Sequence, residues 1–488
     1  MSTVRRIARN TTVMLVAQAL SYVTGFFSVM FMARYLGAES YGVLSFALAF
    51  TGIFAIFTDL GVGTLATRDI ARDRSLTAKY LVNLSLVRVI AVAATFALIA
   101  LTINLMNYPQ QTITVVYLTG LFVVIAAFSQ LFYGIFVGHE RMEYQSLGLF
   151  LNSVAMLVGV VLAIRFKVGV IGFAALYCFA SVVVLLYCVA LYKLRFPQLQ
   201  AEKAIAKVKI DWSFCKSLAK AALPFLLVSV FTAITYRTDM VMLSLMKGNA
   251  AVGFYSAAYR LIDVLSFIPV AFTTALFPVF SQLHISGQDS LRFAYQRSFK
   301  YLLLVGLPIA VATTLVADRI ILGIYASGFN EAAAALRILI WGIPFSFLNS
   351  LLGTTLISIN RQDLMARLSF LLMVLNVIGN LLLIPKYSYV GASIATVVTS
   401  ALACALCLYF VSRLVCPVGL HRLIIRPTMA CAVMVGSLIL LRHLNLFLVV
   451  PVVAIIYLAV LLLLKTFTRE DFDLLKQVGM SRRTRTLE

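Results

Sequence analysis

Two stretches of the chain occur twice at almost the same separation, and this repeat constrains the fold more than any other feature. GAESYGVLSFA begins at Gly37, and GNAAVGFYSAA begins 211 residues later at Gly248. A second pair of similar stretches begins at Arg141 and at Arg361. The matching positions are Gly37, Gly42, Ser45 and Ala47 with Gly248, Gly253, Ser256 and Ala258, and Phe150 and Gly159 with Phe370 and Gly379. A duplicated apolar chain indicates two half-bundles that face each other across a central site, as in transporters.

The composition places the chain in a membrane. Hydrophobic residues make up 62% of the 488 residues and charged residues 12%, with a mean hydropathy of +1.00, whereas a water-facing surface needs about twice that charge density. A bilayer-spanning helix takes roughly 20 apolar residues. Fourteen such segments are predicted: 12–34, 41–60, 81–106, 112–136, 145–164, 169–192, 217–242, 250–280, 299–317, 333–358, 364–384, 388–411, 423–441 and 445–464.

We therefore predict an all-α polytopic membrane protein with two pseudo-symmetric six-helix lobes and two C-terminal helices. The first segment ends at Arg34 rather than at a small-residue cleavage site, so we expect it to be retained as a helix. The predicted divisions are an N-lobe (1–195), a cytoplasmic linker (196–212), a C-lobe (213–412), the last two helices (413–466) and a basic cytoplasmic tail (467–488).

The distribution of basic residues predicts the orientation. With the amino terminus in the cytoplasm, 29 of the 40 lysines and arginines fall on the cytoplasmic side and nine on the other. This asymmetry follows the positive-inside rule and predicts a multi-pass protein of the cytoplasmic membrane with both termini cytoplasmic. The basic residues that orient the chain in the membrane then account for most of the net charge of +22. We expect no nucleic acid partner, and we expect the basic tail to meet anionic lipids at the cytoplasmic face.

Two arginines, Arg88 and Arg260, remain inside predicted spans. A charge inside a bilayer costs at least about 3 kcal/mol, so it usually faces the protein interior or a water-filled cavity. For Arg88 the alternative is a side chain that snorkels toward the cytoplasmic surface. For Arg260 the alternative is a purely structural ion pair with Asp263, which lies one helical turn further on.

Further charges lie at the ends of the first, second and seventh spans: Arg34, Asp59, Arg237 and Asp239. With Arg260 on the eighth span, they cluster on the two helix pairs that the repeat relates, and helices placed equivalently in two halves are suited to line one cavity. Basic residues slightly outnumber the acids there. Because guanidinium groups pair in a fork with phosphate or carboxylate oxygens, an anionic substrate is favoured.

The chain resembles a known family in three stretches. These are VRRIARNTTVMLVAQALSYVTGFFSVMFMARYLGAESYGVLSFALAF, FTDLGVGTLATRDIARD and YRTDMVMLSLMKGNAAVGFYSAAYRLIDVLSFIP. They are similar to the polysaccharide-unit (O-antigen, Wzx-type) flippases of the multidrug/oligosaccharidyl-lipid/polysaccharide exporter superfamily. The resemblance implies two six-helix lobes around a cleft and transfer of a polyprenyl-diphosphate-linked oligosaccharide to the outer leaflet. The resemblance also implies a further partner, the polysaccharide polymerase machinery.

With that resemblance, the residues above receive expected roles. Arg34, Arg237 and Arg260, with Arg88, are expected to bind the diphosphate or acidic sugars. Tyr255 and Tyr259 are expected to contact sugars, or else simply to pack. The energy source stays open, and the candidates for proton or sodium coupling are Asp59, Asp239 and Asp263. We predict no other cofactor, no metal site and no catalytic residue.

Three alternatives remain at this stage. A peptidoglycan-precursor flippase has the same number of helices and a similarly cationic cavity. A drug and cation antiporter of the same superfamily would have a more acidic cavity and twelve helices. A membrane polymerase, ligase or glycosyltransferase would need an extramembrane domain with catalytic acids, and the only D-x-D motif, Asp471 to Asp473, lies in the short basic tail.

Overall fold

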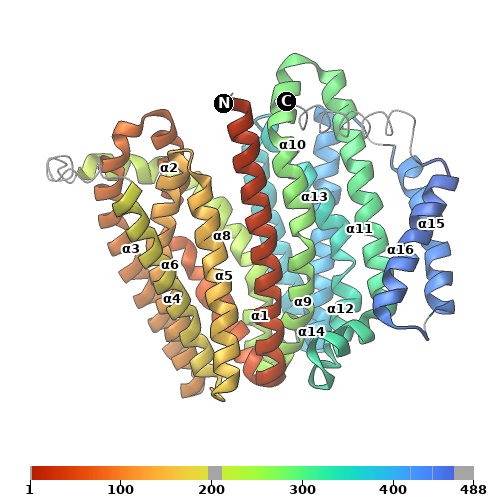
Figure 1. Cartoon of the computed structure of the whole chain (residues 1–488), viewed down its shortest axis with the longest axis horizontal. Coiled ribbons are helices and arrows are strands. Elements are labelled where there is room, and N and C mark those ends of the chain that lie inside the picture. The colour runs from red at the N-terminus through yellow and green to blue at the C-terminus, as the bar shows by residue number, and fades with distance from the viewer. Residues whose placement is uncertain (1–2, 196–210, 418, 442, 467–488) are drawn as a thin grey trace.

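The computed structural model describes residues 3–195, 211–417, 419–441 and 443–466 (Figure 1). Within these residues every regular element is a helix, which confirms the predicted all-α membrane fold. The tail and nearly all of the predicted linker lie outside the described residues. The first half contains α1 (Thr3–Phe54), η1 (Ala55–Thr58), α2 (Val62–Arg72), η2 (Arg74–Leu76), α3 (Thr77–Leu105), α4 (Gln110–Gly138), α5 (Met142–Arg165) and α6 (Val170–Arg195).

The second half follows the same plan and adds two helices. It contains α8 (Trp212–Lys247), α9 (Asn249–Leu265), α10 (Phe267–Ser286), α11 (Gln288–Tyr325), η4 (Ser327–Phe329), α12 (Ala332–Leu339), α13 (Gly342–Ser358) and α14 (Gln362–Leu414). The added helices are α15 (Leu420–Leu440) and α16 (Leu446–Leu463), which pack together and against α11.

The number of membrane-spanning segments is compatible with the prediction of fourteen. Eleven helices in the described part of the chain are long and apolar enough to span, and α12 with α13, bent by 42°, makes a twelfth. Both α1 and α14 join two helices across a non-helical residue, at Gly37 and at Ser388. If the halves of α1 and α14 are counted separately, the predicted number is reached.

The repeated glycines adopt the same backbone conformation in the two halves. Gly37, inside α1, has φ 72° and ψ 172°, and Gly248, between α8 and α9, has φ 83° and ψ 178°. Positive φ at these values is readily available only to glycine. The repeat in the sequence thus corresponds to the same sharp turn between consecutive helices, once in each half.

The two halves meet along α1, α8 and α9. Figure 1 shows α1 and α9 in the middle, with α3 to α6 on one side and α10 to α16 on the other. The part of α1 after Gly37 packs on α9, and one buried apolar cluster contains residues of both halves, among them Phe46 and Tyr255.

The start of α8 belongs by its contacts to the first half. The Asp211 amide donates to the Asn83 side-chain oxygen at 2.8 Å, and Leu218 is buried with Tyr80 in a separate apolar cluster. Further along, α8 packs on α14. The chain therefore crosses between the lobes within α8 itself, after the predicted lobe boundary at residue 213.

Candidate substrate cavity

A cavity of about 1050 Å³ lies between the two halves. Residues of α1 to α6 line it on one side, and Arg237 of α8 and Arg260 of α9 line it on the other. Arg68 and Arg88 add two cations from the first half, whereas Asp59 is the one acid among the described lining residues. The wall of the cavity is therefore predominantly cationic. This arrangement brings Asp59, Arg88, Arg237 and Arg260 together, as the sequence predicted.

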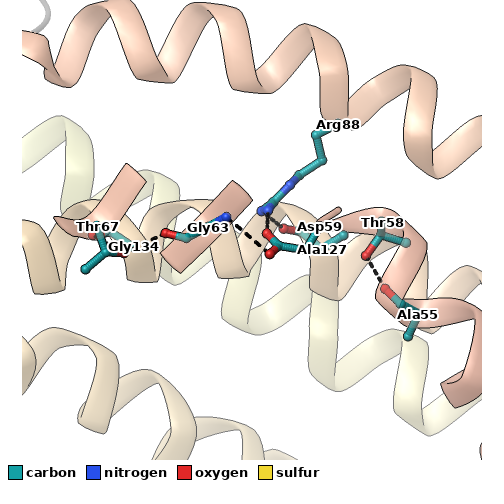
Figure 2. A network of polar contacts seen from close by, with 8 residues as sticks. All are labelled: Ala55, Thr58, Asp59, Gly63, Thr67, Arg88, Ala127 and Gly134. Atoms are coloured by element: carbon teal, nitrogen blue, oxygen red, sulfur yellow. Dashed lines mark hydrogen bonds and ion pairs between the residues drawn. The ribbon is translucent and has the colours of Figure 1, made fainter. Parts of the chain in front are cut away.

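Arg88 is held in the wall of the cavity by two contacts. Its side chain is only 5% exposed, it forms an ion pair with Asp59, and its Nη1 donates to the Ala127 carbonyl at 2.5 Å (Figure 2). A side chain that snorkels would extend toward the membrane surface, so this geometry excludes the snorkelling interpretation for Arg88. The Asp59 carboxylate is its counter-charge.

Asp59 owes its position to a break in the helix. Leu60 and Gly61 both have positive φ, 52° and 73°, which ends η1 and starts α2 in a new direction. The Asp59 carboxylate then accepts the Gly63 amide at 3.2 Å, at the amino end of α2 (Figure 2), where a negative charge is favourable. Gly63 permits this approach, because a Cβ there would lie 2.7 Å from Asp59 Oδ1.

Arg237 crosses the interface from α8 to α1. Its guanidinium lies over Gly52, where an added Cβ would be 2.5 Å from Nη1, and Nη1 donates weakly to the Leu48 carbonyl at 3.3 Å. A larger residue at position 52 would push the guanidinium aside. Gly52 thus provides the space in which a cation from the second half reaches the wall of the first half.

Arg260 is the least satisfied cation of the cavity. Its contact with Asp263 on the same helix is long, 3.9 Å between Nη1 and Oδ2, and Asp263 is 47% exposed. The Arg260 Nε is buried and lacks a hydrogen-bond acceptor among the described residues. A buried donor without an acceptor is costly and calls for an explanation. The purely structural ion pair considered from the sequence therefore accounts for only part of this side chain.

Arg68 is a residue of α2 and lines the end of the cavity that this helix forms. It pairs with Asp69 at 3.1 Å, and its side chain is 54% exposed. Asp69 also accepts from the Tyr80 hydroxyl at 2.6 Å. Partial burial opposes ionisation of Asp69, but the hydrogen bonds from Tyr80 and Arg68 outweigh it and hold the pKa of this carboxyl below its ordinary value. Asp69 therefore stays charged and keeps Arg68 in place.

Asp239 lies outside the cavity, in a polar cluster inside the second half. It is 1% exposed and accepts from Asn380 Nδ2 at 2.5 Å, Tyr255 at 2.6 Å and Thr396 at 2.6 Å. Asn376 accepts from Asn380 at 3.1 Å. The cluster joins α8, α9 and both parts of α14, and most of its polar atoms are oxygens. Oxygen-rich clusters around a carboxylate suit hard cations.

The positions of three predicted cavity residues have to be corrected. The Arg34 guanidinium donates to the carbonyls of Gly323 and Ile324 near the end of α11, so it is engaged away from the cavity. Tyr255 is 1% exposed in the apolar cluster between the lobes, and its hydroxyl donates to Asp239. Tyr259 stacks on Tyr255 with ring centroids 5.6 Å apart. Neither tyrosine lines the cavity, which favours the packing interpretation for both.

Sequence reasoning missed several polar residues that line the cavity: Gln130, Tyr133, Gln145 and Tyr177. All four come from α4, α5 and α6, whereas the charged residues directed attention to the first, second, seventh and eighth predicted spans. An amide such as Gln130 in an otherwise apolar span is a signal that sequence alone offers, because a polar group in a bilayer needs a polar environment.

The comparisons with known proteins agree with this architecture. The family described as "Polysaccharide biosynthesis protein" matches residues 7–284, more than half of the chain, and the MatE family matches residues 224–382. The "Probable low-salt glycan biosynthesis flippase Agl15" of Haloferax volcanii is 22% identical over 84% of each chain. The "Putative O-antigen transporter" of Escherichia coli K12 is 23% identical over 83% of this chain and 96% of its own.

A solved structure supports the fold. The lipid II flippase MurJ in an inward closed conformation superposes with a TM-score of 0.75 over 92% of this chain and 97% of its own, at 14% identity. The predicted family membership is confirmed by these matches taken together. The chain belongs to the polysaccharide biosynthesis protein family of the multidrug/oligosaccharidyl-lipid/polysaccharide exporter superfamily, and it is a transporter rather than an enzyme.

Proposed function

We propose that this protein moves a polyprenyl-diphosphate-linked oligosaccharide, a polysaccharide repeat unit, from the cytoplasmic to the outer leaflet of the cytoplasmic membrane. The observation that carries the proposal is the cavity between the lobes, because arginines from both halves line it. The names of the relatives, a glycan biosynthesis flippase and an O-antigen transporter, point to the same class of cargo.

The chemistry of the cavity suits such a cargo. A diphosphate carries the charge that hydrocarbon excludes, and Arg237 and Arg260 offer guanidinium forks that pair with phosphate oxygens. A diphosphate oxygen would supply the acceptor that the buried Arg260 Nε lacks. The amides and phenols of Gln130, Gln145, Tyr133 and Tyr177 offer hydrogen bonds to sugar hydroxyls. The prenyl chain would remain in the lipid.

Transport would follow by rocking of the two lobes around the cavity. The contact between α1 and α9 near the Gly37 and Gly248 turns would open while the opposite end of the cavity closes. Cations from both lobes would then hold the diphosphate during the exchange. With both termini in the cytoplasm, the Arg68 end of the cavity would be the side from which the cargo enters.

For the energy source, we propose that Na⁺ binds at Asp239. The cluster offers oxygens of Asp239, Asn376, Thr396 and Tyr255, and the buried Asn380 Oδ1 has no hydrogen-bond donor among the described residues. A cation would accept these oxygens as ligands. Because the cluster ties together α8, α9 and α14, binding there would bias the position of the cavity helices. Asp59 and Asp263 are weaker candidates, since each faces an arginine.

The decisive experiment uses the purified protein in liposomes with a fluorescent polyprenyl-diphosphate oligosaccharide, and follows its transfer between leaflets with and without a Na⁺ or proton gradient. Arg237→Gln and Arg260→Gln are each expected to reduce transfer by at least about tenfold. Arg367→Gln, an exposed arginine of α14, is the matched control and should transfer normally. Normal transfer by both cavity variants, or export of organic cations instead, would contradict the proposal.

A second candidate cargo is a peptidoglycan lipid precursor, favoured by the structural similarity to the lipid II flippase MurJ. It shares the polyprenyl diphosphate and differs in its sugars and peptide. The same liposomes loaded with lipid II distinguish the two cargoes, because a polysaccharide-unit flippase is expected to transfer lipid II much more slowly than the oligosaccharide.

A further inference from the structure

The central cavity has an uncharged polar wall that is separate from the cations of the second half. This polar wall consists of Gln130 and Tyr133 of α4 and Gln145 of α5. The second half contributes Arg237 and Arg260 and no other described lining residue. We propose that the polar wall binds uncharged sugar residues of the cargo through their hydroxyl or acetamido groups. This subsite rests on the transport function proposed above, and it assigns the glycan to the first half and the diphosphate to the second.

The two glutamines have hydrogen-bonding groups to spare. Gln130 is exposed and Gln145 half-buried, and both line the cavity. Neither side chain forms a hydrogen bond or an ion pair with another residue that the structure describes. An amide offers an acceptor oxygen and two N–H donors, whereas a guanidinium can only donate. Because a sugar hydroxyl is both donor and acceptor, an amide can pair with it in either direction.

Tyr133 is fixed in the polar wall by its packing against α5. Its side chain is 4% exposed, and a Cβ on Gly148 of α5 would lie 2.4 Å from the hydroxyl oxygen. Within the described residues the hydroxyl has no hydrogen-bond partner. A buried polar group without a partner is rare and needs an explanation. A hydroxyl group of the cargo would provide the partner that the protein itself does not.

The polar wall and the arginines of the second half lie toward opposite ends of the bundle. Gln130 lies eight residues before α4 ends and Gln145 in the first turn of α5, so both are within about 12 Å of the α4–α5 turn. Arg237 lies in the last third of α8, which ends at the Gly248 turn. Three helices, α5, α6 and α8, separate these turns along the chain, and each is long enough to cross the bundle once. One cargo molecule can therefore bind both subsites, with its glycan toward the α4–α5 turn.

The charges of the cavity restrict which sugars the polar wall accepts. Asp59 is the one acid among the described lining residues, and Arg88 and the Gly63 amide already engage its carboxylate. A sugar with a free ammonium group would therefore lose its hydration without gaining a counter-charge, which is unfavourable. A hydroxyl or an acetamido group finds donors and acceptors in the amides instead. The polar wall should prefer neutral sugars to amino sugars.

Native mass spectrometry of the full-length protein in detergent tests this subsite. The probes are a bare polyprenyl diphosphate and the same lipid carrying a neutral trisaccharide. Wild type is expected to bind the glycosylated lipid at least about tenfold more tightly than the bare lipid. Gln130→Leu combined with Gln145→Leu should reduce this ratio to about twofold or less. Gln111→Leu is the matched control, because this exposed glutamine lies at the other end of α4 and outside the cavity, and it should keep the wild-type ratio.

Two further measurements cover misfolding of the double variant and the choice of sugar. Tyr133→Phe removes only the hydroxyl and should lower the ratio about threefold. A trisaccharide with one free amino group should bind wild type at least about fivefold more weakly than its N-acetylated form. An unchanged ratio in both the double variant and Tyr133→Phe would overturn the subsite, since the amides would then bind water only. Equal binding of the two trisaccharides would overturn its preference for neutral sugars.

Failure of this subsite and failure of the proposed transport are distinguishable. If Arg237→Gln weakens the binding of both lipids while the glutamine and tyrosine variants keep the wild-type ratio, the diphosphate site stands and the polar wall does not bind sugar. If wild type binds neither lipid, the proposed cargo is wrong and the glycan subsite is overturned with it.

Discussion

Gly42 and Gly253 occupy equivalent positions in the two repeats and face each other across the interface between the lobes. A Cβ on Gly42 would collide with the carbonyl of Asn249 and lie 3.0 Å from the Gly253 amide nitrogen. A Cβ on Gly253 would collide with the carbonyl of Ala38. Ala38 and Asn249 are themselves related by the 211-residue repeat. The contact is therefore nearly symmetric, and only glycine allows α1 and α9 to approach this closely.

We expect Gly42→Ala or Gly253→Ala to open this contact. The obstacles are backbone carbonyls, which cannot rotate away, and overpacking of this kind costs about 1–3 kcal/mol. A cost of that size shifts a two-state equilibrium by roughly 5- to 150-fold. Spin labels at the exposed positions Glu39 and Ala250, in a background without native cysteines, would report a longer distance between the lobes.

The control for this prediction is Gly436→Ala in α15, where an added Cβ meets no atom within 4 Å. It should leave the distance between the lobes unchanged. An unchanged distance in the Gly42 and Gly253 variants as well would show that the contact does not determine which conformation the lobes adopt.

The repeat is the part of the fold that sequence predicted best. The repeat predicted two related halves, and in the structure the matched Gly37 and Gly248 have nearly the same φ and ψ. The second predicted span ends at residue 60, but the turn at Leu60 and Gly61 and the short helix α2 that follows it were not predicted. As a result the pairing of Asp59 with Arg88 could not be foreseen.

The different environments of Arg237 and Asp239 follow from helix geometry. Residues two apart on an α-helix point about 200° from each other, so when Arg237 faces the cavity Asp239 must face away from it. Asp239 then meets Asn380 and Thr396 of α14, which are more than a hundred residues distant in sequence. Sequence alone gave no means of identifying that partner helix.

Arg34 and Arg237 are expected to differ in how they affect transport. Arg34 binds the backbone of α11 and lies outside the cavity, so Arg34→Gln should change the turnover rate of transport with little effect on the half-saturating cargo concentration. Arg237→Gln removes a cation that lines the cavity and should raise that concentration by at least about tenfold. A concentration dependence of transfer in liposomes measures both quantities. If both variants raise the half-saturating cargo concentration equally, Arg34 must contribute to cargo binding.

Asp59 and Arg88 are expected to be strongly coupled in stability. Asp59→Asn leaves a guanidinium that is 5% exposed without its counter-charge, which we expect to cost about 1–3 kcal/mol, less than for a fully buried pair because Asp59 is 38% exposed. Arg88→Gln should cost less, since Asp59 keeps its bond to Gly63. A double-mutant cycle from unfolding in detergent should give a coupling of about 1 kcal/mol or more. If the losses of unfolding free energy in the two single variants simply add in the double variant, the Asp59–Arg88 pair contributes nothing to stability.

Na⁺ is expected to stabilise the wild-type protein through Asp239. A ligand at 100 times its Kd adds about 2.7 kcal/mol to the stability of the state that binds it, so Tm should rise with NaCl and not with equal choline chloride. Asp239→Asn removes the charge while its neighbours Tyr255, Thr396 and Asn380 remain, and it should abolish the Na⁺-dependent rise in Tm. Asp263→Asn is the matched control, because Asp263 faces Arg260 instead of this oxygen cluster, and it should retain that rise. If Asp263→Asn loses the Na⁺-dependent rise in Tm and Asp239→Asn keeps it, the coupling ion binds beside the cavity arginines. If both variants keep the rise, Na⁺ binds elsewhere in the protein.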